Sequence, residues 1–341
     1  MKKYLLPEKG NFYKANLHAH TNMSDGRDTP EEVKEIFKKM GYSIVAYTDH
    51  DVFVDRSHLC DDTFLALNGM EEEINGRDFG CDWLTMETCH INFIALSQDN
   101  LTVPCYHRTK YLGKNASQYR SAMKIDETKP DFERYYTPER INEMFMIGRD
   151  SGFYMVYNHP TGSLEYYPHY SKYNYMHAVE MYNGKYECNS QVYDDMLRDG
   201  KMIHCVGGDD SHSIDGSGYS WTVIKAENLE YKTVTDALLR GDFYSSQGPE
   251  IFELYVEDGV IHIKTSDAQS ILFQTVARSP GSKYARSECG KTINEAEFKV
   301  LPECVYVRVI VTGPDGKTAS TNAYTVETLL GKDALKTRWT I

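Results

Sequence analysis

Apolar positions in the first part of the chain fall at helical spacing in one segment and form an unbroken strand-like run in the next. In residues 29–42, TPEEVKEIFKKMGY, apolar residues recur three and four positions apart, which is the spacing of one helix face. Thr29 and Pro30 are suited to the N-cap and first helical position, and Gly41 to the end. This pattern predicts a helix followed by a strand over residues 43–51, SIVAYTDHD.

The same helix-then-strand unit recurs further along the chain. Residues 137–152, TPERINEMFMIGRDSG, predict a helix, and FYMVYNHP at 153–160 predicts the strand after it. A strand over 177–184, a helix over 190–200 and a strand over 201–212 follow. Repeated units of this kind favour an α/β protein whose parallel sheet closes into a barrel.

Beyond Gly248 the pattern changes to short alternating runs, such as DGVIHIKTS at 258–266, separated by Gly, Pro and Asp turns. The stretch GPDGK at 313–317 is a hairpin signal. We therefore predict a barrel domain over 1–248 and a small antiparallel β-sandwich domain over 249–341.

Composition narrows the function classes. The chain has 341 residues, 41% of them hydrophobic and 26% charged, with a net charge of −13. Such an acidic chain does not suit a general nucleic-acid binder, which needs a basic surface. No apolar run is long enough for a membrane span or a signal peptide, and the eight cysteines form no CxxC pair. We expect a cytoplasmic protein with no membrane partner, and the sequence leaves its oligomeric state open.

Histidines and acidic residues gather at the ends of the predicted strands. Residues two apart on a strand point to the same side, so His18 and His20 could reach one cation, although an isolated pair could equally be a hydrogen-bonded core pair. Imidazoles with carboxylates suit zinc, manganese or iron better than calcium or magnesium. The candidate metal-ligating residues are His18, His20, Asp25, His50, Glu71, His90, His159, Asp210 and His212.

Six stretches carry these residues in a recognisable order: NLHAHTNMSDG, AYTDHD, LNGMEEE, CHINFIAL, YNHP and GGDDSH. Together they resemble the polymerase and histidinol phosphatase (PHP) family of metal-dependent phosphoesterases. The resemblance implies a distorted (β/α)7 TIM-like barrel with up to three divalent ions at its mouth. It implies one ion held by His18, His20, Glu71 and Asp210, a second by Glu71, His90 and His159, and a third by Asp25, His50 and His212.

The implied enzyme is a hydrolase that cleaves a phosphomonoester or a small phosphodiester by attack of a hydroxide bridging two metal ions. Its substrate would be a small phosphorylated molecule, such as a sugar or nucleotide. Two alternatives stay open. One is a hydrolase of carboxylic or carbamic esters that uses the same site, because a barrel followed by a β-sandwich also resembles a branch of the family with such activities. The other is a non-catalytic protein that binds metal or docks a ligand.

Runs of adjacent acids leave a choice of ligand in two stretches. In the run EEE we choose Glu71, because GME resembles the order of the family motif, and expect Glu72 and Glu73 to be solvated. In GGDDSH, Asp209 stands where the family has a serine. Asp210 shares a strand face with His212, so Asp210 is the predicted ligand and Asp209 the alternative.

Two further predictions concern residues around the ligands. Asp49 is expected to assist catalysis by orienting a ligand histidine, or else to cap a strand end. Residues 100–125 contain no acidic residue and are either a solvated excursion or a lid that binds the substrate anion, with Arg108 and Lys110 as candidate substrate-binding residues. The basic residues of this segment are Arg108, Lys110, Lys114, Arg120 and Lys124.

Overall fold

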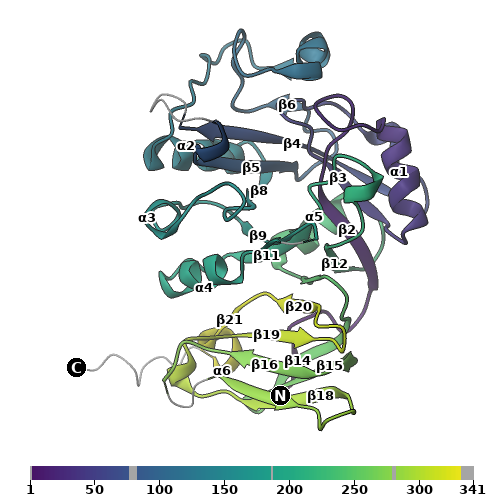
Figure 1. Cartoon of the computed structure of the whole chain (residues 1–341), viewed down its shortest axis with the longest axis vertical. Coiled ribbons are helices and arrows are strands. Elements are labelled where there is room, and N and C mark those ends of the chain that lie inside the picture. The colour runs from purple at the N-terminus through teal and green to yellow at the C-terminus, as the bar shows by residue number, and fades with distance from the viewer. Residues whose placement is uncertain (1, 77–82, 186, 279–281, 332–341) are drawn as a thin grey trace.

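Strand pairing joins much of the chain into one large sheet. The computed structural model describes residues 2–76, 83–185, 187–278 and 282–331. In Figure 1 the mixed α/β part lies above and a group of antiparallel strands, green to yellow, lies below. The order in the large sheet is β10 (Glu187–Cys188), β9 (Ala178–Asn183), β8 (Phe153–Asn158), β5 (Thr88–Ala95), β4 (Leu65–Asn75), β3 (Ile44–Tyr47), β2 (Asn11–Ala19), β12 (Trp221–Ala226), β13 (Phe243–Ser246), β20 (Thr318–Thr321), β19 (Tyr306–Thr312), β16 (Ser270–Gln274) and β17 (Lys283–Arg286), with β11 (His204–Gly208) beside β9 and β21 (Tyr324–Thr325) beside β19.

Three helices lie where the sequence predicts them, within residues 29–42, 137–152 and 190–200. At the start of the first, the Thr29 side chain accepts a hydrogen bond from the Glu32 N–H, and the Glu32 side chain accepts one from the Thr29 N–H. This reciprocal capping satisfies N–H groups that the first turn leaves without partners. No helix within the described residues is long and apolar enough to cross a membrane. The helices are α1 (Pro30–Lys39), α2 (Pro138–Asp150), α3 (Tyr167–Tyr170), α4 (Ser190–Arg198), α5 (Tyr231–Arg240) and α6 (Val326–Leu330).

The predicted α/β class with a large sheet is confirmed. Strands β2, β3 and β4 pair in parallel, as do β8, β9 and β11. Strand β5 runs antiparallel to both β4 and β8, so it departs from a simple repeat of strand and crossover helix. After β11 the chain returns to β2, where the His20 N–H donates to the Ser211 carbonyl at 2.9 Å. This contact brings the first and last of these strand ends together.

A second sheet covers the C-terminal part of the large one. It consists of β1 (Lys2–Tyr4), β14 (Ile251–Glu257), β15 (Val260–Ala268) and β18 (Ile293–Lys299), all antiparallel. Its apolar face shares a buried core with β16 and β19. The predicted hairpin at residues 313–317 joins β19 to β20, with Gly316 at a φ of +82°.

The predicted boundary near residue 248 is crossed by strand pairing. Strand β13, which precedes it, pairs with β20, which follows it, and β1 at the start of the chain pairs with β14. Tyr306 of β19 also belongs to the same buried cluster as Tyr193 of α4. The division into 1–248 and 249–341 stays a prediction.

A buried ion pair links the parts of the chain before and after residue 248. Arg308 of β19 is 1% exposed, and its guanidinium donates to both carboxylate oxygens of Asp194 in α4 at 2.8 and 2.9 Å. It also donates to the hydroxyls of Ser320 and Ser190. A buried charge with several hydrogen bonds costs most when one partner is removed, because the other charge is left without compensation.

We therefore expect Asp194→Ala to lower the free energy of unfolding by about 3 to 5 kcal/mol. Denaturant unfolding measures this change. The matched control is Asp242→Ala, whose partner Arg240 is largely exposed and lies 2.7 Å away, and it should cost about 1 kcal/mol or less. Equal losses in both variants would contradict a specific role for the buried pair.

Candidate metal centre

The nine candidate ligands come together at one place in the fold. They lie on or directly after β2, β3, β4, β5, β8 and β11, so residues far apart in the sequence converge. Ligand-type atoms within 4.8 Å of one another form three overlapping groups. These groups are His18, Glu71, His159 and Asp210; then His50, Glu71 and His90; and then His20, Asp25, His50 and His212.

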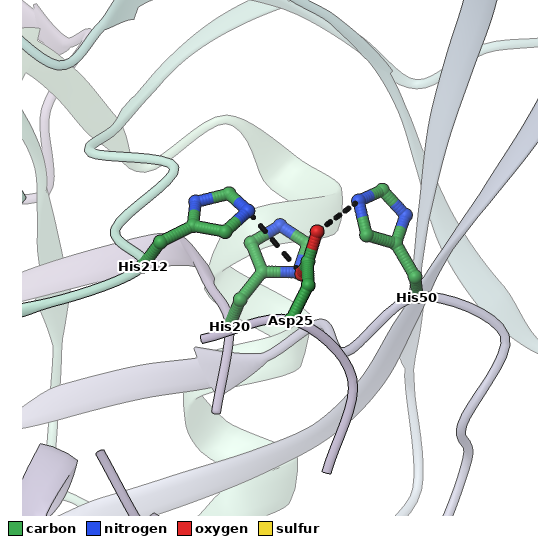
Figure 2. Close-up of side chains that lie close together, drawn as sticks. All are labelled: His20, Asp25, His50 and His212. Atoms are coloured by element: carbon green, nitrogen blue, oxygen red, sulfur yellow. Dashed lines mark ion pairs between the residues drawn. The ribbon is translucent and has the colours of Figure 1, made fainter. Parts of the chain in front are cut away.

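Figure 2 shows the third group, in which Asp25 lies between His50 and His212 and the His20 ring lies behind Asp25. The Asp25 carboxylate is 3.3 Å from His212 Nε2 and 3.8 Å from His50 Nε2. His20 is buried, whereas the side chain of His212 is 40% exposed. This group therefore forms the part of the cluster that is open to solvent.

Glu71 lies between the other two groups. Its Oε1 is 3.3 Å from His18 Nε2, 3.1 Å from His90 Nδ1 and 3.2 Å from His159 Nε2. Its Oε2 faces His20 Nε2 and His50 Nδ1, both at 3.4 Å. One carboxylate therefore presents its two oxygens to two different sets of imidazoles.

The proximity groups differ in part from the sets that the family resemblance implies. His20 lies with Asp25 and His212, although its Nε2 is also 3.0 Å from Asp210 and 3.2 Å from His18 Nε2. His159 lies with His18 as well as with Glu71. The rings are packed closely enough that His50 belongs to two groups and that His20 borders the group of His18 and Asp210 as well as its own.

The two adjacent acids after β11 have different surroundings. Asp210 lies among His18, His20 and His159, and its φ of +50° is in the left-handed region that non-glycine residues rarely adopt. Asp209 instead accepts hydrogen bonds from the backbone N–H groups of residues 218–220 at 2.8 to 2.9 Å. Asp210 thus faces the cluster, whereas Asp209 anchors the loop that follows it.

The electrostatics of the cluster are those of closely packed opposite charges. Burial raises the pKa of Glu71, but the neighbouring charges of His18, His90 and His50 outweigh it and hold that pKa well below its usual range. Burial lowers the pKa of His20, while Asp210 and Glu71 raise it to about 10. The carboxylates therefore require positive charge around them, whether from protonated imidazoles or from metal ions.

The hydrogen bonds of His18 show that this residue set fits a metal ion. The Glu180 carboxylate is 3.1 Å from His18 Nδ1, so that nitrogen carries the donated proton. In the neutral ring, Nε2 then carries a lone pair and is itself an acceptor. Its neighbours at 3.3 and 3.4 Å are carboxylate oxygens of Glu71 and Asp210, which are also acceptors, so no hydrogen bond joins them. Among the described residues, Asp210 Oδ1, His20 Nδ1 and His90 Nδ1 are buried without a hydrogen bond of good geometry, although Asp210 Oδ1 lies 3.0 Å from His20 Nε2 and His90 Nδ1 lies 3.1 Å from Glu71 Oε1. A cation among these atoms would satisfy them.

Glu180 is a site residue that sequence reasoning missed. It lies within β9, is 1% exposed and also accepts a hydrogen bond from the backbone N–H of His159 at 3.1 Å. It therefore holds two ligand-bearing segments at once. A lone acid within the apolar run AVEMYN was the available signal, because such a residue needs a buried partner.

Asp49 is hydrogen-bonded to a turn and to an arginine, and its role in catalysis stays a prediction. Its buried carboxylate accepts hydrogen bonds from the Thr21 N–H at 2.7 Å, from the Ser24 hydroxyl at 2.9 Å and from Arg56 at 2.7 Å. No interaction with a ligand histidine is found for it among the described residues. Asp49 instead fixes the turn that carries Asp25, because Thr21 and Ser24 lie within that turn.

The expectation that Glu72 is solvated is wrong. Glu72 is 1% exposed and lies 3.3 Å from Arg134, which also pairs with Asp51 at 2.5 Å. Successive strand residues point to opposite sides, so Glu72 faces away from the side on which Glu71 meets the histidines. Glu73 is 33% exposed and lies 3.6 Å from His90 Nε2.

Arg108 and Lys110 lie in the long excursion between β5 and α2, which includes the short strands β6 (Thr102–Val103) and β7 (Lys124–Ile125). Arg108 pairs with Asp131 at 2.6 Å and Lys110 with Glu133 at 2.8 Å. Both charges are thus compensated within the excursion, and their role in substrate binding stays a prediction. The basic residue of this segment that contacts the cluster is Lys114, 2.8 Å from Asp25.

Fold and site together define an α/β protein whose strand ends carry a His, Asp and Glu cluster able to hold divalent metal ions. No family model matches the sequence, and no curated protein matches it.

Solved structures similar to this chain include a two-domain protein of Bacteroides vulgatus that contains a predicted PHP-like metal-dependent phosphoesterase. It is 16% identical, with 95% of this chain and 98% of that chain covered and a TM-score of 0.47. A protein of Bifidobacterium adolescentis assigned as a metal-dependent phosphoesterase is 17% identical, with 69% and 98% covered and a TM-score of 0.40. A lesion-specific endonuclease of Pyrococcus furiosus is 14% identical, with 83% and 69% covered and a TM-score of 0.41. All three identities are below 25% and all three TM-scores are below 0.5.

Because Glu180 orients His18, we expect Glu180→Gln to weaken metal affinity by about 10- to 100-fold while the fold is retained. An amide offers one acceptor oxygen and cannot replace both carboxylate contacts. Competition with a chelator of known affinity measures the change. The control is Glu187→Gln on the neighbouring strand β10, where Glu187 accepts from the Gly162 N–H and from Asn189. If Glu180→Gln bound metal as tightly as the control variant, Glu180 would not orient His18 for metal binding.

Proposed function

We propose that this chain is a PHP-type metal-dependent phosphoesterase built on a distorted (β/α)7 barrel. The observation that carries the proposal is the position of Glu71, whose two oxygens face separate sets of histidines. A carboxylate in this position suits a site with two metal ions about 3.5 to 4 Å apart, which is typical of enzymes that hydrolyse phosphate esters. A single structural ion would not need such a shared ligand.

The residues that would hold the ions are the nine that converge. Glu71 would be shared between an ion held with His18, His159 and Asp210 and another held with His90 and His50, the latter facing Oε2. A third would be held by Asp25, His50 and His212, with His20 and His50 on the border between groups. Imidazole and carboxylate ligands suit zinc, manganese or iron, and the number and identity of the ions are part of the proposal.

Bound ions would supply Lewis acidity towards a phosphoryl oxygen and would lower the pKa of a water molecule. The chain's own residues provide the fixed geometry. Glu180 holds the His18 ring, and Asp49 together with Arg56 holds the turn that carries Asp25. The exposed side chain of His212 marks the side from which a substrate would reach the cluster.

The first test is metal content. Protein supplied with manganese, zinc or iron should retain about two or three equivalents after desalting, the number expected of a site with shared carboxylates. Chelation should lower both the melting temperature and the hydrolysis of phosphate esters, because ions that bind only the folded state stabilise it. Elemental analysis with fewer than one equivalent after supplementation would overturn the proposal. A panel of a phosphomonoester, a phosphodiester and a carboxylic ester distinguishes the alternative hydrolases.

The second test compares the two neighbouring glutamates. Glu71→Gln should lower activity by about 100-fold or more and reduce the metal content, because the amide cannot serve two ions. Glu72→Gln is the matched control: Arg134 keeps its Asp51 partner, so the metal content should not change. If only the Glu72 variant lost metal, the shared ligand would be Glu72 and our assignment of Glu71 would be wrong.

A further inference from the structure

The excursion between β5 and α2 brings one cation to the solvent-open side of the cluster. Lys114 Nζ lies 2.8 Å from Asp25 Oδ2, and the adjacent Asn115 side chain donates to the Asn22 carbonyl at 3.1 Å. Asn22 and Asp25 belong to the same turn after β2. Two successive residues of the excursion therefore touch the segment that carries a candidate ligand.

Lys114 differs from the other cations of its segment. Arg108 pairs with Asp131 and Glu127, and Lys110 pairs with Glu133. Arg120 donates to the Tyr106 hydroxyl and to backbone carbonyls. The partners of these three side chains therefore all lie within the excursion, whereas the partner of Lys114 is a residue of the cluster.

Asp25 has more nitrogen neighbours than the two oxygens of one carboxylate need. Its oxygens are 3.3 Å from His212, 3.7 Å from His20 and 3.8 Å from His50, in addition to the contact with Lys114. When Asp25 ligates an ion, the ion compensates its charge and the ammonium group is free to bind another anion. The Lys114 side chain is 72% exposed, so such an anion can reach it from solvent.

The backbone around Lys114 supports a specific placement. Lys114 has a φ of +44° and Tyr111 a φ of +70°, both in the left-handed region. Non-glycine residues adopt this conformation at an energetic cost, and such positions cluster at binding sites because the surrounding contacts hold them. The Asn115 contact with Asn22 is one such contact.

We propose that Lys114 is a substrate-binding residue whose ammonium group binds an anionic oxygen of the phosphoryl group, beside the ions at Asp25. This inference rests on the proposed function and narrows it, because it assigns the site to substrates with an anionic reacting group. A neutral carboxylic ester offers no anionic oxygen to an ammonium at this position.

The experiment compares Lys114→Ala with Lys232→Ala in full-length, manganese-loaded protein. Both lysines are exposed and pair with a carboxylate, Lys114 with Asp25 and Lys232 with Asp236 in α5, so the variants lose the same charge in different places. The probe is inorganic phosphate, whose binding is measured by calorimetry and whose inhibition of p-nitrophenyl phosphate hydrolysis is measured in parallel. Manganese content is determined for every sample.

Lys114→Ala should weaken phosphate binding by about 10-fold or more and raise KM for p-nitrophenyl phosphate by a similar factor. Hydrolysis of p-nitrophenyl acetate, where measurable, and the manganese content should not change. Lys114→Arg, which keeps the charge, should restore part of the phosphate affinity. Lys232→Ala should bind phosphate as the unaltered protein does.

Equal phosphate affinity in the two alanine variants would overturn the role of Lys114, even if the unaltered protein is an active phosphoesterase. Loss of manganese from Lys114→Ala would also overturn it, because the residue would then support the ligands rather than the substrate. A manganese-loaded protein that hydrolyses no phosphate ester would refute the proposed function separately. The phosphate-binding comparison would still test whether Lys114 binds the anion.

Discussion

A single buried carboxylate that faces five imidazoles constrains the rest of the structure. Glu71 is 1% exposed, and its oxygens lie 3.1 to 3.4 Å from nitrogens of His18, His20, His50, His90 and His159. A buried charge is tolerated only when it is paired and its partners are held in place. Strands β2, β4 and β5 and the segments after β3 and β8 must therefore end at the same place, and the connections between them must support the rings.

Neighbouring residues divide these tasks between them. Asp49, His50 and Asp51 are consecutive: His50 faces the cluster, whereas Asp49 binds Arg56 and Asp51 binds Arg134. The pairs Glu71 with Glu72 and Asp210 with Asp209 repeat the pattern, one acid at the cluster and the next buried against another partner. Because successive side chains of a strand point to opposite sides, β4 supplies a ligand and its neighbouring anchor from adjacent positions, whereas Asp51 and Asp210 lie after their strands in backbone with positive φ values.

This division explains which features the sequence could predict. Helix caps and apolar spacing depend on nearby residues, so α1 and α2 follow the predicted segments closely. The nine candidate ligands were found because strand ends of similar composition converge in such folds. The partners of Glu72 and Glu180, Arg134 and His18, are far from them in the sequence, and no local pattern indicates these pairs. Arg56 is only seven residues from Asp49, but no helix or strand period links the two positions. The antiparallel course of β5 was missed for the same reason, since apolar runs do not reveal strand direction.

Charge in this protein acts over short distances. With a net charge of −13, the chain as a whole repels anions, yet screening at physiological salt limits such repulsion to about 8 Å. The charges next to the cluster therefore decide what can bind there. Within the excursion, Arg108 and Lys110 are neutralised by their own carboxylates, so they add little field at the cluster. Lys114 is placed differently, because its partner Asp25 is itself a candidate metal ligand. The same ammonium group would compensate Asp25 before metal binding and would face a substrate afterwards, which couples the metal content of the site to its affinity for anions.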